Sequence, residues 1–438
     1  MSNYRYQIEN YHSIKKADIA IDGITVLAGV NGAGKSTLAR WLYYIVNISH
    51  SYEYTRFREY IKSINELISQ YEVVQKDIAD DTDLSENLSI AKQSILDMHY
   101  TKMAAVNKIM NVYAAATDHF VDILRASFHS MNKNNKVRVL NYLQIENIEG
   151  ESDDDLLNRF QTIQLQKAES IRNRFIQLQK NRPIEKFYES IKRLYSEVDF
   201  PKTLSFQEDG VEIINDDKIG NLFGLEDAIY IDTPMALSVT ESNNPFWKDL
   251  RLMLRNNTEE TEYDDVARGL LSQLRDITGG KVTDKKDIVG KDELYFTRKS
   301  DNLIVKLENM ATGIKTFAYL DRLLENGFLI YDTILILDEP EAHLHPQWIV
   351  EFARMLVRIH KDTGLYIMLA SHDPDMVSAI RYVAEAEGVL DRINFYLAEQ
   401  DNESQSYIYR ALGNDIEPIF ASFNKSFELI EKYGVDNG

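Results

Sequence analysis

The first 50 residues carry short apolar runs separated by polar turns, a pattern that predicts strands followed by a helix. We expect strands over Tyr4–Glu9, Ala17–Ile21 and Ile24–Ala28. The third run is apolar almost throughout, which is typical of a strand buried on both faces of a sheet. After a glycine-rich segment, apolar residues recur at helical spacing from Leu38 to Val46. The chain therefore begins like an α/β domain.

From residue 48 to residue 199 the apolar period changes to that of helices. Apolar residues lie three and four positions apart over Ile61–Ile78, Met98–Tyr113, Leu156–Lys180 and Ile184–Val198. Glycine occurs only once between Gly34 and Gly210. This stretch is predicted to be an all-helical insertion, either a helical subdomain with ordinary core faces or a short coiled-coil-like arm.

Strand patterns return after residue 200. Two hairpins are predicted, one by Lys202–Phe206 with Val211–Ile214 and one by Leu294–Arg298 with Leu303–Leu307. Further elements are expected at Ala228–Asp232, Thr333–Leu337 and Leu365–Ala370 as strands and at Met310–Leu324 as a helix. Alternating strands and helices predict an α/β head with a mostly parallel sheet. Residues 1–47 and 200–438 form this head, and residues 48–199 form the insertion.

Composition excludes several classes of protein. The chain has 438 residues, of which 44% are hydrophobic and 27% charged, as in ordinary globular proteins. It has no cysteine, which excludes disulfides, thiolate zinc sites and a cysteine nucleophile. A net charge of −20 argues against non-specific wrapping in DNA. The N-terminus has no apolar signal region, and no apolar run reaches the ~18 residues of a membrane span. We expect a cytoplasmic protein without membrane contact.

The glycine-rich segment from Gly29 to Ser36 fits the phosphate-loop pattern G-x-x-x-x-G-K-[ST] in full. It follows a buried strand and opens a helix, so its backbone N–H groups and the helix N-terminus favour phosphate oxygens. Lys35 is expected to reach the β- and γ-phosphates of ATP, and the Ser36 hydroxyl to bind Mg²⁺. The nucleotide-binding residues predicted here are Gly29, Asn31, Gly32, Ala33, Gly34, Lys35, Ser36 and Thr37.

Two acids and a histidine follow two other predicted strands. Asp338 and Glu339 end the apolar run Thr333–Leu337, and ligands bind at this end of the strands in parallel α/β sheets. We expect Asp338 to hold Mg²⁺ and Glu339 to act as the general base on the attacking water. His372 follows the strand Leu365–Ala370 and is predicted to sense the γ-phosphate.

The order of these motifs resembles an ABC-type ATPase head. The segments Ile8–Ile14 and Glu339–Pro346 are more similar to one branch, which holds RecF and SMC heads, OLD-family ATPases and prokaryotic anti-phage defence ATPases such as that of the Septu system. The resemblance covers about residues 1–47 and 200–400. The insertion resembles that of the family only in its position along the chain.

The resemblance implies that two heads sandwich two ATP molecules in a homodimer or a higher homo-oligomer. The signature motif of one head then caps the γ-phosphate held by the other, and Thr312, Gly313 and Lys315 are its matching residues. Ala311 replaces the usual serine of this motif. The glutamine that binds the metal in the family is matched by Gln207, after the strand Lys202–Phe206.

The resemblance also suggests a biological role. OLD nucleases carry a further nuclease domain, whereas the residues after His372 contain no clear acidic metal cluster. We therefore expect an ATPase without nuclease activity of its own, acting as sensor or scaffold of an anti-phage defence complex with a separately encoded effector such as a nuclease. The alternatives are a DNA-repair or DNA-structuring ATPase that binds DNA directly and, third, a transporter nucleotide-binding subunit.

A basic segment lies within the insertion. Residues 158–193 hold nine Lys or Arg and three Glu, which is +6 in a chain of −20. The segment predicts either a solvated helix face with internal ion pairs or a surface for nucleic acid or an acidic partner. The sequence leaves both interpretations open for the Arg159–Arg193 face.

Overall fold

The structure is a computed structural model that divides the chain into two compact units. The head unit comprises residues 1–50 and 183–438, and the helical unit comprises residues 51–182. The described residues are 2–78, 82–99, 103–128, 130–146, 148, 150–233, 236, 244–255, 265–286, 292–298 and 300–422. The second border differs from the expected one because α6 (Ile184–Tyr195) belongs to the head unit.

A ten-stranded sheet forms the centre of the head unit. Its strand order is β5-β4-β1-β2-β13-β12-β3-β11-β10-β6. The strands are β1 (Tyr4–Tyr11), β2 (Ile14–Ile21), β3 (Ile24–Ala28), β4 (Thr203–Glu208), β5 (Val211–Ile214), β6 (Asp227–Ile231), β10 (Thr333–Asp338), β11 (Tyr366–Ser371), β12 (Ile393–Gln400) and β13 (Tyr407–Gly413). The expected fold class, an α/β P-loop ATPase head, is confirmed.

The strands from β12 to β6 are parallel and carry the predicted motifs. β3 pairs with β11 and β12, and β10 pairs with β11 and β6, all in parallel register. Every residue of β3, β10 and β11 is buried, as the continuous apolar runs predicted. The parallel register brings the C-terminal ends of these strands to one edge of the sheet.

Helices complete this half of the head. They are the start of α1 (Lys35–Ile78), then α7 (Pro245–Arg255), α8 (Asp265–Thr278), α9 (Thr312–Glu325), α10 (Pro346–Thr363) and α11 (Pro374–Ala386). Leucine and isoleucine side chains from α8 to α11 join those of the parallel strands in one apolar core. Short 3₁₀ helices are η1 (Leu307–Asn309), η2 (Pro340–His343) and η3 (Leu390–Arg392).

The other half of the large sheet is mainly antiparallel. β1 pairs with β2 and β4, and β4 pairs with β5, so the predicted hairpin at Asp209-Gly210 is present. Tyr6 of β1 is fully buried, and its hydroxyl donates to the carbonyl of Leu38 in α1. This contact places one face of the antiparallel strands against the helix that follows the phosphate loop.

A separate three-stranded sheet also belongs to the head unit. It has the order β7 (Gly280–Lys286), β8 (Asp292–Arg298) and β9 (Leu303–Lys306), with antiparallel pairing throughout. The predicted second hairpin is therefore present as β8 and β9. The sequence pattern did not indicate β7.

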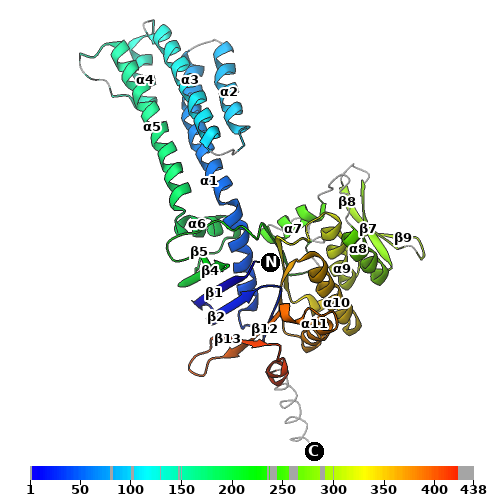
Figure 1. Ribbon diagram of the computed structural model, residues 1–438. Coiled ribbons are helices and arrows are strands. Elements are labelled where there is room, and N and C mark those ends of the chain that lie inside the picture. The colour runs from blue at the N-terminus through cyan, green and yellow to red at the C-terminus, as the bar shows by residue number, and fades with distance from the viewer. Residues whose placement is uncertain are drawn as a thin grey trace, which may run out of the picture. The chain divides into compact units, whose positions relative to one another are not determined.

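The helical unit contains α2 (Thr82–Leu96), α3 (Met103–Phe128), α4 (Lys133–Tyr142), α5 (Asp153–Asn181) and the second part of α1. Figure 1 shows α1, α3 and α5 running alongside one another within this unit. The predicted apolar stripe from Ile61 to Val74 lies in its core, together with Val106, Ile109 and Phe160. The expected all-helical character is present in every described element of the unit.

Candidate active site

The phosphate loop connects β3 to α1 in a conformation that requires glycine. Gly32 and Gly34 have φ values of 82° and 93°, which glycine adopts without the strain of other residues. A Cβ atom on Gly34 would lie 2.6 Å from Cγ1 of Ile14, so the turn between β1 and β2 packs directly on the loop. Ala33 is buried, and its carbonyl accepts a hydrogen bond from the Tyr409 hydroxyl.

Lys35 is folded into this loop. The side-chain Nζ donates to the carbonyls of Gly29 at 2.8 Å and Val30 at 3.1 Å, and the residue is 4% exposed. Burial lowers the pKa of Lys35, while the nearby Glu339 carboxylate acts in the opposite direction. The ammonium group is therefore held at the loop by backbone oxygens. Among the other predicted loop residues, Asn31 is exposed, and Ser36 and Thr37 are half-buried.

Asp338 meets Ser36 at the C-terminal end of β10. The Ser36 hydroxyl donates to Asp338 Oδ1 at 3.0 Å, and the hydroxyl of Tyr230 in β6 donates to Oδ2 at 2.9 Å. Burial raises the pKa of Asp338. The structure thus brings together two of the predicted metal-binding residues. Hydroxyl and carboxylate oxygens are the ligand type that Mg²⁺ prefers, so these residues fit the metal.

Glu339 and His372 also lie side by side. Glu339 has φ 49° and ψ 50°, a left-handed conformation, and its N–H donates to the carbonyl of Ala370 in β11. Its Oε1 lies 3.3 Å from Nδ1 of His372. Both side chains are about one-third exposed, so solvent reaches them. Adjacent strand ends therefore present a predicted base and a predicted phosphate sensor together.

The signature residues begin α9. Ala311 is the N-cap residue and provides no side-chain cap, while Thr312 and Gly313 form the first turn and are half-buried. Lys315 is buried, with Nζ donating to the carbonyl of Glu308, and burial lowers its pKa. The helix N-terminus therefore offers Thr312 and Gly313 for an anion, and the Lys315 ammonium supports the turn before the helix.

The structure does not bring Gln207 to this site. Gln207 lies on β4 and pairs with Arg5 of β1, five places from β3 in the strand order. Its neighbour Phe206 pairs with Tyr6. The Tyr6 side chain lies on the face of the sheet that packs on α1. Because side chains alternate along a strand, Gln207 lies on the opposite face. β6, which adjoins β10, is followed directly by Asp232, and burial raises the pKa of this carboxyl.

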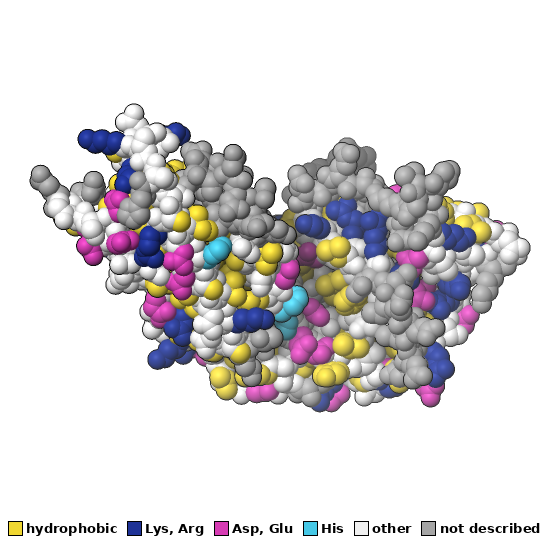
Figure 2. All heavy atoms as spheres, turned by 90° about the horizontal axis from the view of Figure 1, so that it is seen from above, with side chains coloured by type: hydrophobic (Ala, Val, Ile, Leu, Met, Phe, Trp, Pro, Cys, Tyr) yellow, Lys and Arg dark blue, Asp and Glu magenta, His cyan; other side chains and the backbone are white. Residues whose placement is uncertain are grey.

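The predicted basic segment is divided between α5 and α6, and many of its charges are paired. Arg159 binds Glu151, Arg172 binds Glu169, and Arg182 binds Glu53. Lys167, Arg174 and Lys180 of α5 are exposed and belong to no ion pair among the described residues. Figure 2 shows Lys and Arg side chains interspersed with Asp and Glu over the face seen from above.

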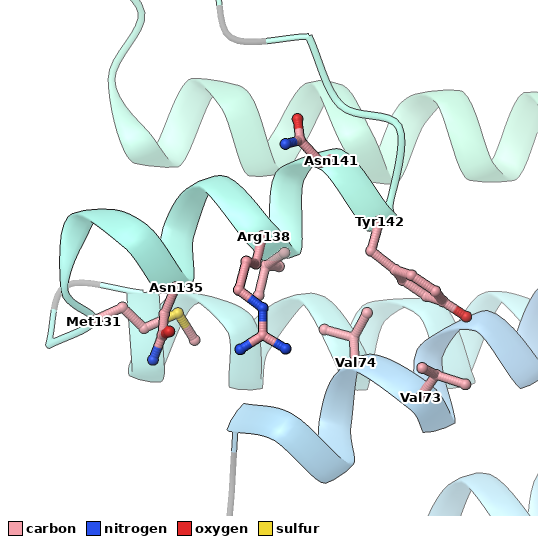
Figure 3. Close-up of a pocket in the computed structure, with 8 residues that line it drawn as sticks. Val73, Val74, Met131, Asn135, Arg138, Asn141 and Tyr142 are labelled. Atoms are coloured by element: carbon pink, nitrogen blue, oxygen red, sulfur yellow. The ribbon is translucent and has the colours of Figure 1, made fainter.

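The helical unit has a cavity of about 500 Å³ that none of the predicted residues lines. Figure 3 shows that α4 supplies Arg138 and Tyr142 to this cavity and that α1 supplies Val73 and Val74. Its wall combines aliphatic side chains with the guanidinium of Arg138. The residues predicted to bind ATP and Mg²⁺ all lie in the head unit instead.

Sequence reasoning missed two residues that contact the predicted site. Tyr230 lies in an expected strand, but nothing in its pattern indicated the bond to Asp338. Glu341 is two residues beyond Glu339, and its carboxylate accepts from Ser371. The signal that could have identified Glu341 is its place in the motif after an apolar strand. An acid that becomes buried there needs a hydrogen-bond partner.

These features define the class of the protein. A glycine loop connects a buried parallel strand to a helix, and the carboxylate of Asp338 accepts a hydrogen bond from the loop serine. A histidine lies at the end of the neighbouring strand. Together these features make up a P-loop ATPase head. Residues 5–377 match the AAA ATPase domain family. The chain belongs to this family.

Relatives with curated descriptions share a smaller part of the chain. A putative ABC transporter ATP-binding protein, CPE0195, of Clostridium perfringens strain 13 is 32% identical over 112 residues, which are 24% of this chain and 38% of that protein. The energy-coupling factor transporter ATP-binding protein EcfA2 of C. perfringens strain SM101 gives the same identity and coverage. The chain thus spans 38% of the length of these relatives.

Solved structures of SMC heads align over most of the chain. An SMC head bound to the C-winged helix domain of ScpA aligns with a TM-score of 0.40 at 9% identity, covering 93% of this chain and 97% of that one. The SMC head domain from Thermotoga maritima aligns with a TM-score of 0.37 at 11% identity, covering 94% and 99%. Within the described part of the chain, every helix is too short or too polar to cross a membrane.

Proposed function

We propose that this chain binds ATP together with Mg²⁺ and hydrolyses it to ADP and phosphate. The observation that carries the proposal is the contact of Ser36 with Asp338, which joins the phosphate loop to the end of β10. Glu339 follows directly, beside His372. A metal-binding pair, a base and a sensor then surround one place at the sheet edge where phosphates bind.

Each residue has a separate role in this proposal. The loop N–H groups and Lys35 bind the β- and γ-phosphates. Ser36 and Asp338 hold Mg²⁺, which when bound neutralises charge on the phosphates. Glu339 accepts a proton from the attacking water, and His372 contacts the γ-phosphate.

Dimerisation completes the site in this proposal. Thr312 and Gly313 stand at a helix N-terminus, and in a second copy they would cap the γ-phosphate bound by the first. ATP then holds two heads together, and hydrolysis releases them. The matching experiment is sedimentation of the Glu339→Gln variant with and without ATP, with a shift to the dimer expected only with ATP.

We further propose that the ATPase acts as sensor or scaffold in an anti-phage defence complex with a separate effector, such as a nuclease. Support comes from the motif between Glu339 and Pro346, from the net charge of −20 and from the internal pairing of Arg159, Arg172 and Arg182. An ATP-driven change can shift an effector between held and released states only through different contacts in the two states.

Direct DNA binding, as in a repair or DNA-structuring ATPase, is the second candidate. The exposed bases Lys167, Arg174 and Lys180 on α5 favour it, because unpaired cations on one helix attract phosphates. The relatives described as transporter ATP-binding proteins match 24% of this chain, so a transporter subunit has the least support of the three candidates.

One experiment separates these candidates. The purified chain is assayed for ATP hydrolysis with Mg²⁺, for DNA cleavage and for DNA binding, and proteins that co-purify from the native host are identified. We expect ATP hydrolysis, intact DNA, weak DNA binding and one co-purifying effector. Tight ATP-dependent DNA binding without a protein partner would favour the repair function. Absence of ATP hydrolysis by every preparation contradicts the ATPase.

A further inference from the structure

A buried carboxyl group beside the proposed catalytic residues has no assigned role. The Glu341 side chain is 3% exposed, on η2 directly after β10. Its Oε1 accepts hydrogen bonds from the Ser371 hydroxyl at 2.7 Å and from the His372 backbone N–H at 3.0 Å. Its Oε2 has no hydrogen bond in the described part of the chain. Glu341 therefore connects the segment after β10 to the end of β11.

The ring of His372 is close to the same carboxylate. Its Nδ1 lies 3.4 Å from Oε1 of Glu341 and 3.3 Å from Oε1 of Glu339. This nitrogen is buried and forms no well-aligned hydrogen bond with the described residues. Two carboxylates are thus the acceptors within reach of one Nδ1 proton, and a small ring rotation decides between them.

Physical differences between the two acids favour Glu341 as the acceptor. Glu339 is 37% exposed, so water can solvate its charge, whereas the charge of Glu341 is removed from water. Burial raises the pKa of Glu341, and a proton on His372 Nδ1 offsets this cost. Oε1 of Glu341 is also held in place by Ser371 and the backbone, so less side-chain entropy is lost when it binds the ring.

We propose that Glu341 is a positioning residue that holds a proton on Nδ1 of His372 and thereby leaves Glu339 free to accept the proton of the attacking water. A carboxylate on one ring nitrogen sets the tautomer and orientation of a histidine. The two nitrogens point to different sides of the ring, so Nε2 is directed away from both acids. Phosphate oxygens accept hydrogen bonds, so His372 contacts the γ-phosphate with Nε2 also protonated, and the Glu341 carboxylate on the Nδ1 proton stabilises that charged ring. This inference rests on the proposed ATPase function.

Glu341→Gln tests the charge while keeping the contacts. The amide oxygen can still accept from Ser371 and from the His372 N–H, and the amide nitrogen replaces the Oε2 atom that has no partner, so the variant is expected to fold. Ser371→Ala keeps the charge and removes one donor. Glu351→Gln is the matched control, because Glu351 is a partly exposed acid on α10 that pairs with Arg354.

The first measurement needs no nucleotide. Long-range ¹⁵N–¹H spectra of protein labelled on histidine report which ring nitrogen carries the proton, and His372→Gln identifies the His372 signals. We expect Nδ1 of His372 to be protonated in the wild type, in Ser371→Ala and in Glu339→Gln, with the same chemical shift of the Nδ1 proton in all three. Glu341→Gln removes the charge that accepts this proton, so there the Nδ1 proton should shift upfield. An upfield shift in Glu339→Gln with none in Glu341→Gln would overturn the proposal.

The second measurement is steady-state ATP hydrolysis. Loss of a group that orients a functional histidine should lower kcat about 10- to 100-fold in Glu341→Gln, with KM for ATP within about twofold. Glu351→Gln should match the wild type. A wild-type kcat in Glu341→Gln refutes the positioning role alone. An inactive wild type refutes the ATPase instead, and the spectra still decide whether Glu341 holds the ring.

Discussion

The head unit and the helical unit bury polar groups in different ways. In the head, Asp338, Glu339 and Glu341 gather around the ends of β10 and β11, with Lys35 in the adjacent loop. Burial raises the pKa of Asp338, and the like charge of Glu339 raises it further. Such an excess of acids is stabilised by a bound cation, and perturbed groups of this kind mark functional sites.

The helical unit buries several neutral polar groups, of which some bond to one another and others, such as the Asn65 amide, have no hydrogen-bond partner in the described part of the chain. The Tyr71 hydroxyl lies 2.8 Å from that of Tyr113 and 3.3 Å from Thr117 Oγ1, and these groups are neutral. Its buried Arg182 lies over the ring of Tyr52 and pairs with Glu53. The comparison teaches that burial of polar groups alone does not indicate a site. Accumulated like charge at converging strand ends does.

Replacing Lys35 tests the head side of this comparison with the largest expected effect. Lys35→Ala should weaken ATP binding about a hundredfold or more, because a charge-assisted contact to the phosphates is lost. Isothermal titration calorimetry measures the change. Lys281→Ala, at an exposed lysine of β7, is the control and should bind ATP normally. Unchanged affinity in Lys35→Ala would remove the nucleotide site from this loop.

Glu339→Gln separates binding from chemistry at the same site. The amide cannot accept a proton from water, so kcat should fall about 10²- to 10⁴-fold while ATP is still bound. Phosphate release under single-turnover conditions measures the rate. Glu385→Gln, at an exposed acid of α11, should hydrolyse ATP like the wild type. Full turnover by Glu339→Gln would transfer the base role to another residue, with His372 the next candidate.

The exposed bases of α5 test whether the helical unit also has a ligand. If this face binds nucleic acid or an acidic partner, changing Lys167, Arg174 and Lys180 to Glu should weaken binding about tenfold at low salt and reduce its salt dependence. Arg182 is better left intact, since it is buried against Tyr52. The control reverses the same number of exposed lysines in the head unit, namely Lys202, Lys248 and Lys281. If both triple variants bind equally well, the α5 charges belong to a solvated helix face that binds no ligand.

The smallest effect is expected from the hydroxyl network of the helical unit. Tyr71→Phe keeps the ring that stacks on Phe120 at 4.4 Å and removes the hydroxyl bonded to Tyr113. Unfolding by urea should show a loss of about 1 kcal/mol, with ATP hydrolysis unchanged. Tyr54→Phe, at a residue that is 54% exposed, should unfold like the wild type. A loss of ATP hydrolysis in Tyr71→Phe would contradict a purely structural role for this network.

Local patterns were sufficient for most of the head. The buried runs that became β3, β10 and β11, and the polar residues directly after them, could be read without knowledge of their partners. β7 was missed because Gly280–Lys286 is polar and does not alternate clearly. α6 was expected in the insertion because its helical period resembles that of α5. Packing, which periodicity does not reveal, places it in the head unit.

The sequence by itself determined the phosphate loop, the strand-end acids and the helical insertion, because each depends on residues adjacent in the chain. Only the tertiary structure decided which distant groups meet there: Tyr230 on Asp338, Glu341 on Ser371, and Gln207 on the far face of another strand. Strand order sets these contacts, and the pairing of strands that are not neighbours in the chain leaves no period in the sequence.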